Sequence, residues 1–135
     1  MQKILSIDVG EKRVGLATSD ELGIIASPFG FIDRDGAVAK IADIVVKENV
    51  GQIVVGLPFL PSGGLGSQAE DVQKFVHELQ LATKVDIDFE NEVLSSVEAA
   101  NRLKSMKRKV KNKGEVDAMA ATIILESYMN RRSVE

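Results

Sequence analysis

Cysteine is absent from this chain of 135 residues, and histidine occurs once, at His77. Without cysteine the protein can form no disulfide framework, thiolate zinc site or thiol nucleophile. The amino terminus lacks a basic stretch followed by an apolar one, so we expect no signal peptide. No apolar run is long enough to span a bilayer. These absences favour a cytoplasmic protein without a membrane partner.

The overall composition is ordinary for a globular protein. Apolar residues make up 44% of the chain and charged residues 27%, which are typical values for a folded domain. The length is sufficient to bury a core but is short for two domains. The sequence contains no internal repeat and no linker between domains. We therefore expect residues 1–135 to form a single domain.

The net charge of −3 is unevenly distributed along the chain. One segment, from Arg102 to Lys113, carries +7 and leaves −10 for the rest of the chain. Its basic residues, with no acid among them, are Arg102, Lys104, Lys107, Arg108, Lys109, Lys111 and Lys113. Such a run can bind phosphates, or it can be a solvated loop between helices. Its position between two candidate site acids, Glu92 and Asp117, favours phosphate binding.

Hydrophobic periodicity predicts an alternation of strands and helices. Three strands joined by short links suggest an antiparallel meander, and a later continuous apolar run suggests a buried strand parallel to the first. A further strand with alternating acids should lie at an edge of the sheet. The predicted strands are Lys3–Val9, Arg13–Thr18, Gly23–Ile32, Gln52–Leu57 and Val85–Glu90. The predicted helices are Gly36–Asn49, Ser67–Leu81, Ser95–Met106 and Glu115–Asn130.

Three acids stand at the ends of these predicted elements. Asp8 closes the first apolar run, Glu92 follows the last predicted strand, and Asp117 opens the final helix. Carboxylates that converge in an open cleft suit Mg²⁺, which takes oxygen ligands and keeps several waters in its coordination shell. The sequence thus predicts a metal site formed by residues that only a fold can gather.

Each acid alone also has an ordinary structural explanation. Asp8 precedes Gly10 in a sequence that makes a good turn, and Glu92 could be a surface acid. Asp117 could be favoured by the macrodipole in a first helical turn. However, Asp117 falls at helical spacing with residues of an apolar face: Ala120, Ala121, Ile124, Leu125 and Tyr128. The joint pattern of the three acids, rather than any one of them, indicates a site.

Three stretches of the chain resemble the motifs of a known family. They are Ile7–Ala17 followed by Ser19-Asp20, Val55–Pro58 followed by a glycine-rich loop, and Val116–Ala121. Together they resemble the YqgF family, also called RuvX, whose members are named pre-16S rRNA nucleases or Holliday junction resolvases. The resemblance covers nearly the whole chain. It implies an α/β, ribonuclease H-like fold, in which helices flank a five-stranded mixed sheet of order 3-2-1-4-5.

The resemblance also implies a site and an activity. Asp8, Glu92 and Asp117 correspond to the family's acidic triad, which would bind two Mg²⁺ or Mn²⁺ ions. The leading hypothesis is a two-metal nuclease, a hydrolase of structured nucleic acid that acts in pre-16S rRNA processing and ribosome biogenesis. Lys12, Arg13 and the segment Arg102 to Lys113 would neutralise substrate phosphates. The choice of RNA over branched DNA depends on the family resemblance alone.

One stretch departs from the family pattern. Where the family has Asp-Glu-Arg, this chain has Asn91-Glu92-Val93, so the glutamate is kept and two charges are lost. An arginine at position 93 could bind a substrate phosphate, and valine cannot. Two alternatives therefore stay open: a Holliday junction resolvase-like DNA endonuclease, and a nucleic-acid-binding module with weak or lost catalysis. A monomer and a homodimer are both compatible with the sequence.

Overall fold

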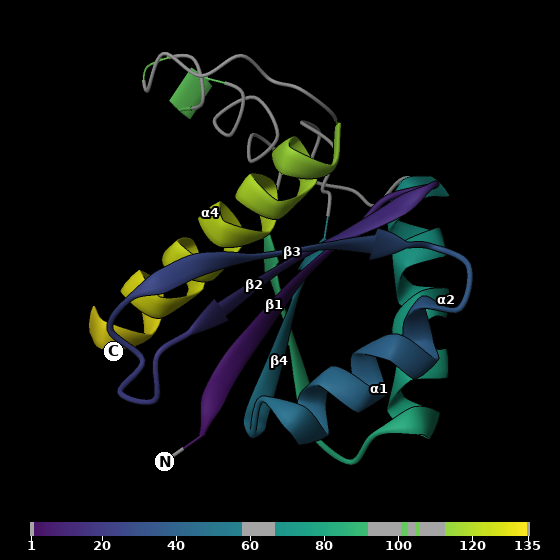
Figure 1. Ribbon diagram of the computed structural model, residues 1–135, viewed down its shortest axis with the longest axis horizontal. Coiled ribbons are helices and arrows are strands. Elements are labelled where there is room, and N and C mark those ends of the chain that lie inside the picture. The colour runs from purple at the N-terminus through teal and green to yellow at the C-terminus, as the bar shows by residue number, and fades with distance from the viewer. Residues whose placement is uncertain (1, 58–66, 92–100, 103–104, 106–112, 135) are drawn as a thin grey trace.

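The computed structural model describes residues 2–57, 67–91, 101–102, 105 and 113–134 (Figure 1). The main elements within these residues follow one another as strands, then helices and strands in alternation. They are β1 (Lys3–Val9), β2 (Arg13–Ser19), β3 (Ala26–Asp33), α1 (Ala37–Lys47), β4 (Val50–Leu57), α2 (Ser67–Ala82), β5 (Asp86–Asn91) and α4 (Lys113–Val134).

The five strands form one mixed sheet in the order β3-β2-β1-β4-β5. The pairs β1–β2 and β2–β3 are antiparallel, whereas β1–β4 and β4–β5 are parallel. Antiparallel neighbours can be joined by short turns, but parallel neighbours need crossovers, and α1 and α2 lie in the crossovers to β4 and β5. The predicted sheet order, the antiparallel meander and the edge position of the last strand are confirmed.

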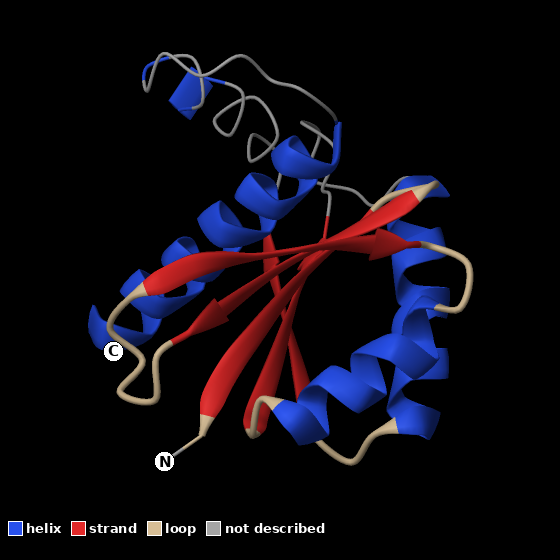
Figure 2. Cartoon of the chain, in the orientation of Figure 1, coloured by secondary structure: helices blue, strands red, loops and turns tan. Residues whose placement is uncertain are grey.

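The sheet separates two layers of helices (Figure 2). Helices α1 and α2 pack on one face and complete the larger apolar core. Helix α4 lies across the other face and contacts all five strands (Figure 1). No helix in the described parts of the chain is long and apolar enough to cross a membrane.

Alternation along β1 decides which side chains meet which layer. Ile7 is fully buried in the core under α1 and α2. The neighbouring Ser6 points the other way, because its hydroxyl donates a hydrogen bond of 2.8 Å to the carbonyl of Ala121 in α4. Successive side chains of a strand point to opposite faces. Asp8, two residues after Ser6, therefore lies on the face that α4 covers.

Small residues let α4 approach β2 closely. Ala17 is buried against Ala121 and Leu125. At Gly15 the approach is closer still, because a Cβ there would overlap the backbone carbonyl of Asp117. Only glycine fits between this strand and the helix. Gly15 thus determines how closely the backbone of Asp117 packs against the sheet.

Strand β3 begins at Ala26, three residues later than predicted from the apolar pattern. The intervening residues form a turn in which both Ile24 and Ile25 donate backbone hydrogen bonds to the Asp20 carboxylate, at 2.7 and 3.0 Å. Gly23 has a φ of 70°, a left-handed conformation that glycine adopts without strain. The bonds from Ile25 and Ile24 lower the pKa of Asp20. The two isoleucines are as apolar as strand residues, which explains the wrong start of the predicted strand. They are exposed, however, and their backbone is not part of the sheet.

Helix α4 begins at Lys113, two residues earlier than predicted. Asp117 consequently lies in the second turn rather than the first, and the first-turn acid is Glu115. The macrodipole acts mainly within the first turn, so it does not account for Asp117. Of the predicted helix Ser95–Met106, residues 101, 102 and 105 are described and are helical, and the others lie outside the described residues.

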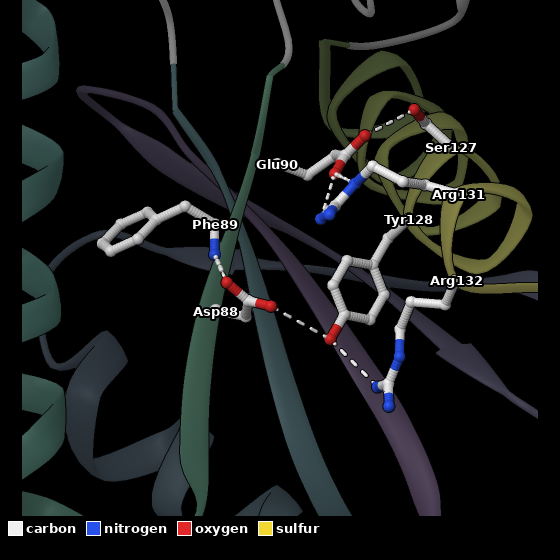
Figure 3. A network of polar contacts seen from close by, with 7 residues as sticks. All are labelled: Asp88, Phe89, Glu90, Ser127, Tyr128, Arg131 and Arg132. Carbon is white, nitrogen blue, oxygen red and sulfur yellow. Dashed lines mark hydrogen bonds and ion pairs between the residues drawn. The ribbon is translucent and has the colours of Figure 1, made fainter. Parts of the chain in front are cut away.

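The carboxyl-terminal half of α4 is attached to β5 by charged side chains (Figure 3). Glu90, with only 10% of its side chain exposed, accepts a hydrogen bond of 2.7 Å from the Ser127 hydroxyl. Its other carboxylate oxygen accepts one of 2.9 Å from Nε of Arg131. Both oxygens of this carboxylate are thus bound to residues of α4.

Tyr128 extends the same attachment toward the start of β5. Its ring is 2% exposed, and its hydroxyl donates to Asp88 at 3.2 Å and accepts from Arg132 at 3.0 Å (Figure 3). The guanidinium groups of Arg131 and Arg132 each lie 5.4 Å from the ring centroid, within cation–π range. Burial raises the pKa of the Tyr128 phenol. A buried aromatic ring with a satisfied hydroxyl makes this end of the helix rigid.

Candidate active site

Asp8 and Asp117 occupy neighbouring positions on one face of the sheet. Asp8 is the next-to-last residue of β1, and its register partner in β2 is Gly15. The backbone of Asp117 lies directly against Gly15. Register partners on adjacent strands point to the same face, so Asp8 lies on the α4 side, near the carboxyl end of β1, on the same face as Asp117.

Arg13 is the ion-pair partner of Asp117. Its Nε donates to Oδ2 of Asp117 at 2.9 Å, and about a quarter of each side chain is exposed, 26% and 25% respectively. The pair lines an open cavity of about 460 Å³ together with Gly10, Glu11 and Lys12. Solvent therefore reaches the carboxylate of Asp117, which is a requirement for any group that must meet a substrate.

The turn between β1 and β2 depends on glycine at position 10. The Gly10 N–H donates to the Arg13 carbonyl at 2.9 Å. A Cβ at Gly10 would stand 2.8 Å from the same carbonyl oxygen, which is closer than real Cβ atoms approach. This tight closure leaves Glu11 and Lys12 exposed at the rim of the cavity.

Arg34 holds this turn against α2, and sequence reasoning did not identify it. Its Nη1 donates to the Gly10 carbonyl at 2.8 Å, and its backbone N–H donates to the Lys12 carbonyl at 2.8 Å. The same guanidinium makes two bonds of 3.1 Å to the Asp71 carboxylate and lies 5.0 Å from the ring centroid of Phe75. A lone arginine after a strand carries no sequence signal for such a role.

The Arg34–Asp71 pair also borders a second open cavity, of about 780 Å³, lined by Glu11, Arg34, Gln68 and Asp71. The hydrogen bonds from Arg34 lower the pKa of the Asp71 carboxyl. Both groups are therefore charged and bound to each other at neutral pH. Glu11 borders both cavities, so the turn after β1 lies between them.

The structure describes some of the predicted phosphate-binding residues. Lys12 is exposed beside the first cavity, whereas Arg13 is bound to Asp117. Arg102 forms an exposed ion pair of 2.6 Å with Glu126, and Lys113 is the first residue of α4. The third predicted site acid and five basic residues lie outside the described residues: Glu92, Lys104, Lys107, Arg108, Lys109 and Lys111.

The donor chemistry beside the first cavity suits a hard divalent cation. Two carboxylates on one face and an opening to solvent are compatible with Mg²⁺ or Mn²⁺, which keep waters and substrate oxygens among their ligands. Within the described ranges, no group of three or more histidine, cysteine or acidic residues could hold a metal. Among the described residues, the acids that line this cavity are Glu11 and Asp117, and Asp8 lies on the same face of the sheet as Asp117.

The fold of this chain is similar to that of proteins with known structures. RuvC from Thermus thermophilus, solved in complex with a Holliday junction substrate, superposes with a TM-score of 0.60 over 98% of this chain and 97% of that one, at 14% identity. RuvC from the same organism solved separately gives a TM-score of 0.62 at 13% identity. Identities this low establish the fold alone. That fold is ribonuclease H-like, as the motifs predicted.

Sequence similarity identifies the family. The profile of the RuvX family, described as Holliday junction resolvase, matches residues 2–131. A Synechocystis protein named "Putative pre-16S rRNA nuclease" is 42% identical over 95% of this chain and 87% of its own length. The chain therefore belongs to the RuvX family, which confirms the resemblance seen in its motifs.

Proposed function

We propose that this protein is a metal-dependent nuclease that hydrolyses phosphodiester bonds in structured nucleic acid, with precursor 16S rRNA as the leading substrate. One observation carries the proposal. Asp117 lines a cavity open to solvent, and its backbone packs on Gly15, the register partner of Asp8 on the same face of the sheet.

In this proposal Asp8, Asp117 and Glu92 hold Mg²⁺ or Mn²⁺. When bound, such ions activate a water and neutralise charge on the attacked phosphate and the leaving 3′-oxygen. The part of the protein itself is to hold the carboxylates in place. Gly15 allows Asp117 to reach the level of Asp8, and Arg34 holds the turn that follows Asp8.

Lys12 and the segment Arg102 to Lys113 supply positive charge for substrate phosphates. Lys12 is exposed at the cavity that Asp117 lines. Charges of this kind bind any polyanion and bring its backbone to the carboxylates, without reading sequence. The segment carries +7 whereas the rest of the chain carries −10. We therefore expect this segment, rather than the protein as a whole, to attract nucleic acid before contact is made.

Two substrate classes have separate support. The name of the Synechocystis relative favours precursor rRNA, and hence action in the cytoplasm during ribosome maturation. The description of the family, and the RuvC structure with a Holliday junction, favour branched DNA as the second candidate. A third possibility is binding without turnover, which the neutral residues Asn91 and Val93 would explain.

Cleavage assays on a precursor-rRNA helix and a four-way DNA junction distinguish these cases. With Mg²⁺ or Mn²⁺ present, the wild-type protein should cleave the RNA, and EDTA should abolish cleavage. Asp8→Asn should lower the rate at least about a hundredfold, because loss of an outer partner of a metal ligand already costs about 10–100-fold. Preferential cleavage of the junction would favour the DNA candidate, and tight binding without cleavage would contradict a nuclease.

The salt dependence of binding tests the basic segment. Replacing Lys107, Arg108 and Lys109 with glutamine should reduce the slope of log affinity against log salt concentration by about 0.7–0.9 for each phosphate that the variant no longer neutralises. Lys40, Lys47 and Lys74, changed together to glutamine, provide a matched control of equal charge on other elements. An equal reduction in both triple variants would mean that net charge, and not this segment, sets the affinity.

A further inference from the structure

We propose that Arg13 is a positioning residue that exchanges partners during the binding of metal and substrate. Without a divalent ion it holds the Asp117 carboxylate, and once Asp117 binds an ion, Arg13 turns to a phosphate of the nucleic acid. This inference rests on the proposed metal site and adds to it a coupling between two ligands. Arg13 was expected from the sequence to contact phosphate only, whereas its observed partner is an acid of the site.

The geometry of the pair sets up a competition. Nε of Arg13 stands 2.9 Å from Oδ2 of Asp117, at the carboxylate that the proposed function assigns to a metal. A guanidinium and a divalent cation at one carboxylate repel each other, since like charges a few ångströms apart interact strongly. Metal binding therefore weakens the hold of Asp117 on Arg13.

Release of Arg13 is inexpensive because the pair is accessible to water. About a quarter of each side chain is exposed, so the pair is part-buried and water screens it in part. The bond uses Nε, and a guanidinium offers five N–H donors in a planar fork that matches phosphate. A freed Arg13, in a cavity shared with Lys12, is well suited to bind a substrate phosphate.

Arg34 provides the internal contrast. Its guanidinium binds both oxygens of Asp71 and the Gly10 carbonyl, and it also lies over the Phe75 ring. Moving Arg34 would break all of these interactions, whereas the side chain of Arg13 makes one ion pair with the described part of the chain. The two arginines next to the same turn therefore differ in role: Arg34 is fixed and Arg13 is exchangeable.

The exchange couples the two ligands. Metal releases Arg13 for phosphate, so metal should increase nucleic-acid affinity by more than its own charge contributes, and nucleic acid should increase metal affinity by the same factor. Removing Arg13 should then have two opposite effects. It should tighten metal binding to the free protein, because a competing cation is gone, and it should reduce the coupling.

The decisive variant is Arg13→Gln, studied by binding alone. Mn²⁺ affinity without nucleic acid is measured by electron paramagnetic resonance, and hairpin-RNA affinity by fluorescence anisotropy in EDTA and in Ca²⁺. The variant should bind Mn²⁺ roughly twofold to fivefold more tightly, the range expected when an exposed ion pair no longer competes. The gain in RNA affinity caused by Ca²⁺ should fall about tenfold, the size of one charge-assisted hydrogen bond.

Arg131→Gln is the matched control, since it also removes an arginine from an ion pair, that with Glu90, away from the cavity. It should leave both the Mn²⁺ affinity and the coupling unchanged. Arg13→Lys, which keeps the charge, protects against a folding artefact and should restore part of the coupling. The melting temperatures of Arg13→Gln and Arg13→Lys, followed by circular dichroism, should stay close to that of the wild type. Arg131→Gln should melt somewhat earlier because its partner Glu90 is only 10% exposed, so all binding is measured well below the melting transition of this variant.

A direct view of the exchange is available from the Nε–H resonance of Arg13, assigned by its disappearance in Arg13→Gln. Addition of Mg²⁺ should shift this signal and speed its exchange with water, and addition of RNA should then slow that exchange. An unchanged Arg13 signal at saturating metal would overturn the exchange while leaving the metal site intact.

Two outcomes of the binding measurements would also overturn the exchange. Weaker Mn²⁺ binding by Arg13→Gln would mean that Arg13 is a fixed support for Asp117. An equal loss of RNA affinity with and without the ion would mean that Arg13 only contacts phosphate. Absence of Mn²⁺ binding to the wild type would overturn the proposed function as well.

Discussion

The two ends of α4 hold their charged side chains in different ways. Near its carboxyl-terminal end, Glu90 is 10% exposed and is bound by two side chains, while Tyr128 is 2% exposed. In its second turn, Asp117 has 25% of its side chain exposed and is bound by Arg13 beside an open cavity. One end of the helix is anchored to the sheet, and the other presents a carboxylate to solvent.

One helix can thus both pack firmly on the sheet and present a carboxylate to solvent. A carboxylate that must accept a new ligand has to be accessible, and accessibility reduces the stability it can contribute. The stability must then come from elsewhere on the same rigid element, and buried aromatic and aliphatic groups supply it. Tyr128 and its neighbours keep α4 on the sheet, so that Asp117 stays at the level of Asp8 without tight pairing of its own.

The largest expected effect breaks the anchored end. Tyr128→Ala should lower the free energy of unfolding by about 3–5 kcal/mol, as for other buried aromatic residues. Asp117→Asn should change it less, by about 1 kcal/mol, because it removes one ion pair that is partly screened by water. Urea unfolding followed by circular dichroism measures both. Equal losses at the two positions would show that the two ends of α4 do not differ as proposed.

A change at position 93, which lies outside the described residues, should alter the rate of cleavage without altering stability. If an arginine at position 93 normally contacts a substrate phosphate, Val93→Arg should restore an interaction of roughly 1.5–3 kcal/mol. Since each 1.36 kcal/mol is about tenfold in rate, cleavage should become roughly ten- to a hundredfold faster, measured under single-turnover conditions. The gain should vanish in an Asp8→Asn background. An unchanged rate with unchanged metal affinity would assign phosphate binding to Lys12, Arg13 or the Arg102 to Lys113 segment.

Gly15 links the packing of α4 on the sheet to the position of Asp117. Gly15→Ala should force α4 away from β2 and cost about 1–3 kcal/mol, the usual cost of overpacking. Because the displaced atoms belong to Asp117, Mn²⁺ affinity should fall as well. Gly23→Ala is a matched control: its φ of 70° makes alanine strained there, but no atom lies within 4 Å of the added Cβ. It should lose about 1–2 kcal/mol and keep its metal affinity, so a loss of affinity in both variants would contradict the steric account.

The smallest expected effect concerns pH. Burial raises the pKa of Tyr128 above that of an unfolded tyrosine, so the folded protein holds this proton more tightly. The stabilisation is complete below the unfolded pKa of about 10 and is lost as pH rises through the folded value. The chain has one tyrosine, so phenolate absorbance reports on this group alone. Unfolding free energy should fall with pH above about 10 in the wild type, and Tyr128→Phe should remove that part of the slope.

Local patterns predicted most elements of the fold. The expected range of the first strand coincides with β1, and the apolar spacing after Asp117 matches the face that α4 buries. Such periodicities survive because burial of alternate or every third and fourth residue is a local consequence of one covered face. The order of the sheet came from the family resemblance and is confirmed by the topology.

Errors occurred where apolar residues were exposed or where an end depended on tertiary contacts. Ile24 and Ile25 resemble strand residues, but they lie in a turn with 69% and 61% of their surface exposed. The start of α4 was predicted two residues late because polar residues at a helix end carry little periodic signal. The pairing of Arg13 with Asp117 was not predicted, because the two residues are far apart in the sequence.

Composition and periodicity establish which residue types are available for chemistry: carboxylates and basic groups, with no thiol, at the ends of the predicted elements. Packing of the sheet and helices then determines which of those charges lie next to one another. Arg13 and Arg34 both lie close to the same turn. Among the described residues, the side chain of Arg13 is bound by one partly exposed acid, whereas that of Arg34 is bound by an acid, a backbone carbonyl and an aromatic ring. Periodicity is written locally, whereas the partner of a charge depends on which distant segment the packed sheet and helices bring within a few ångströms of it.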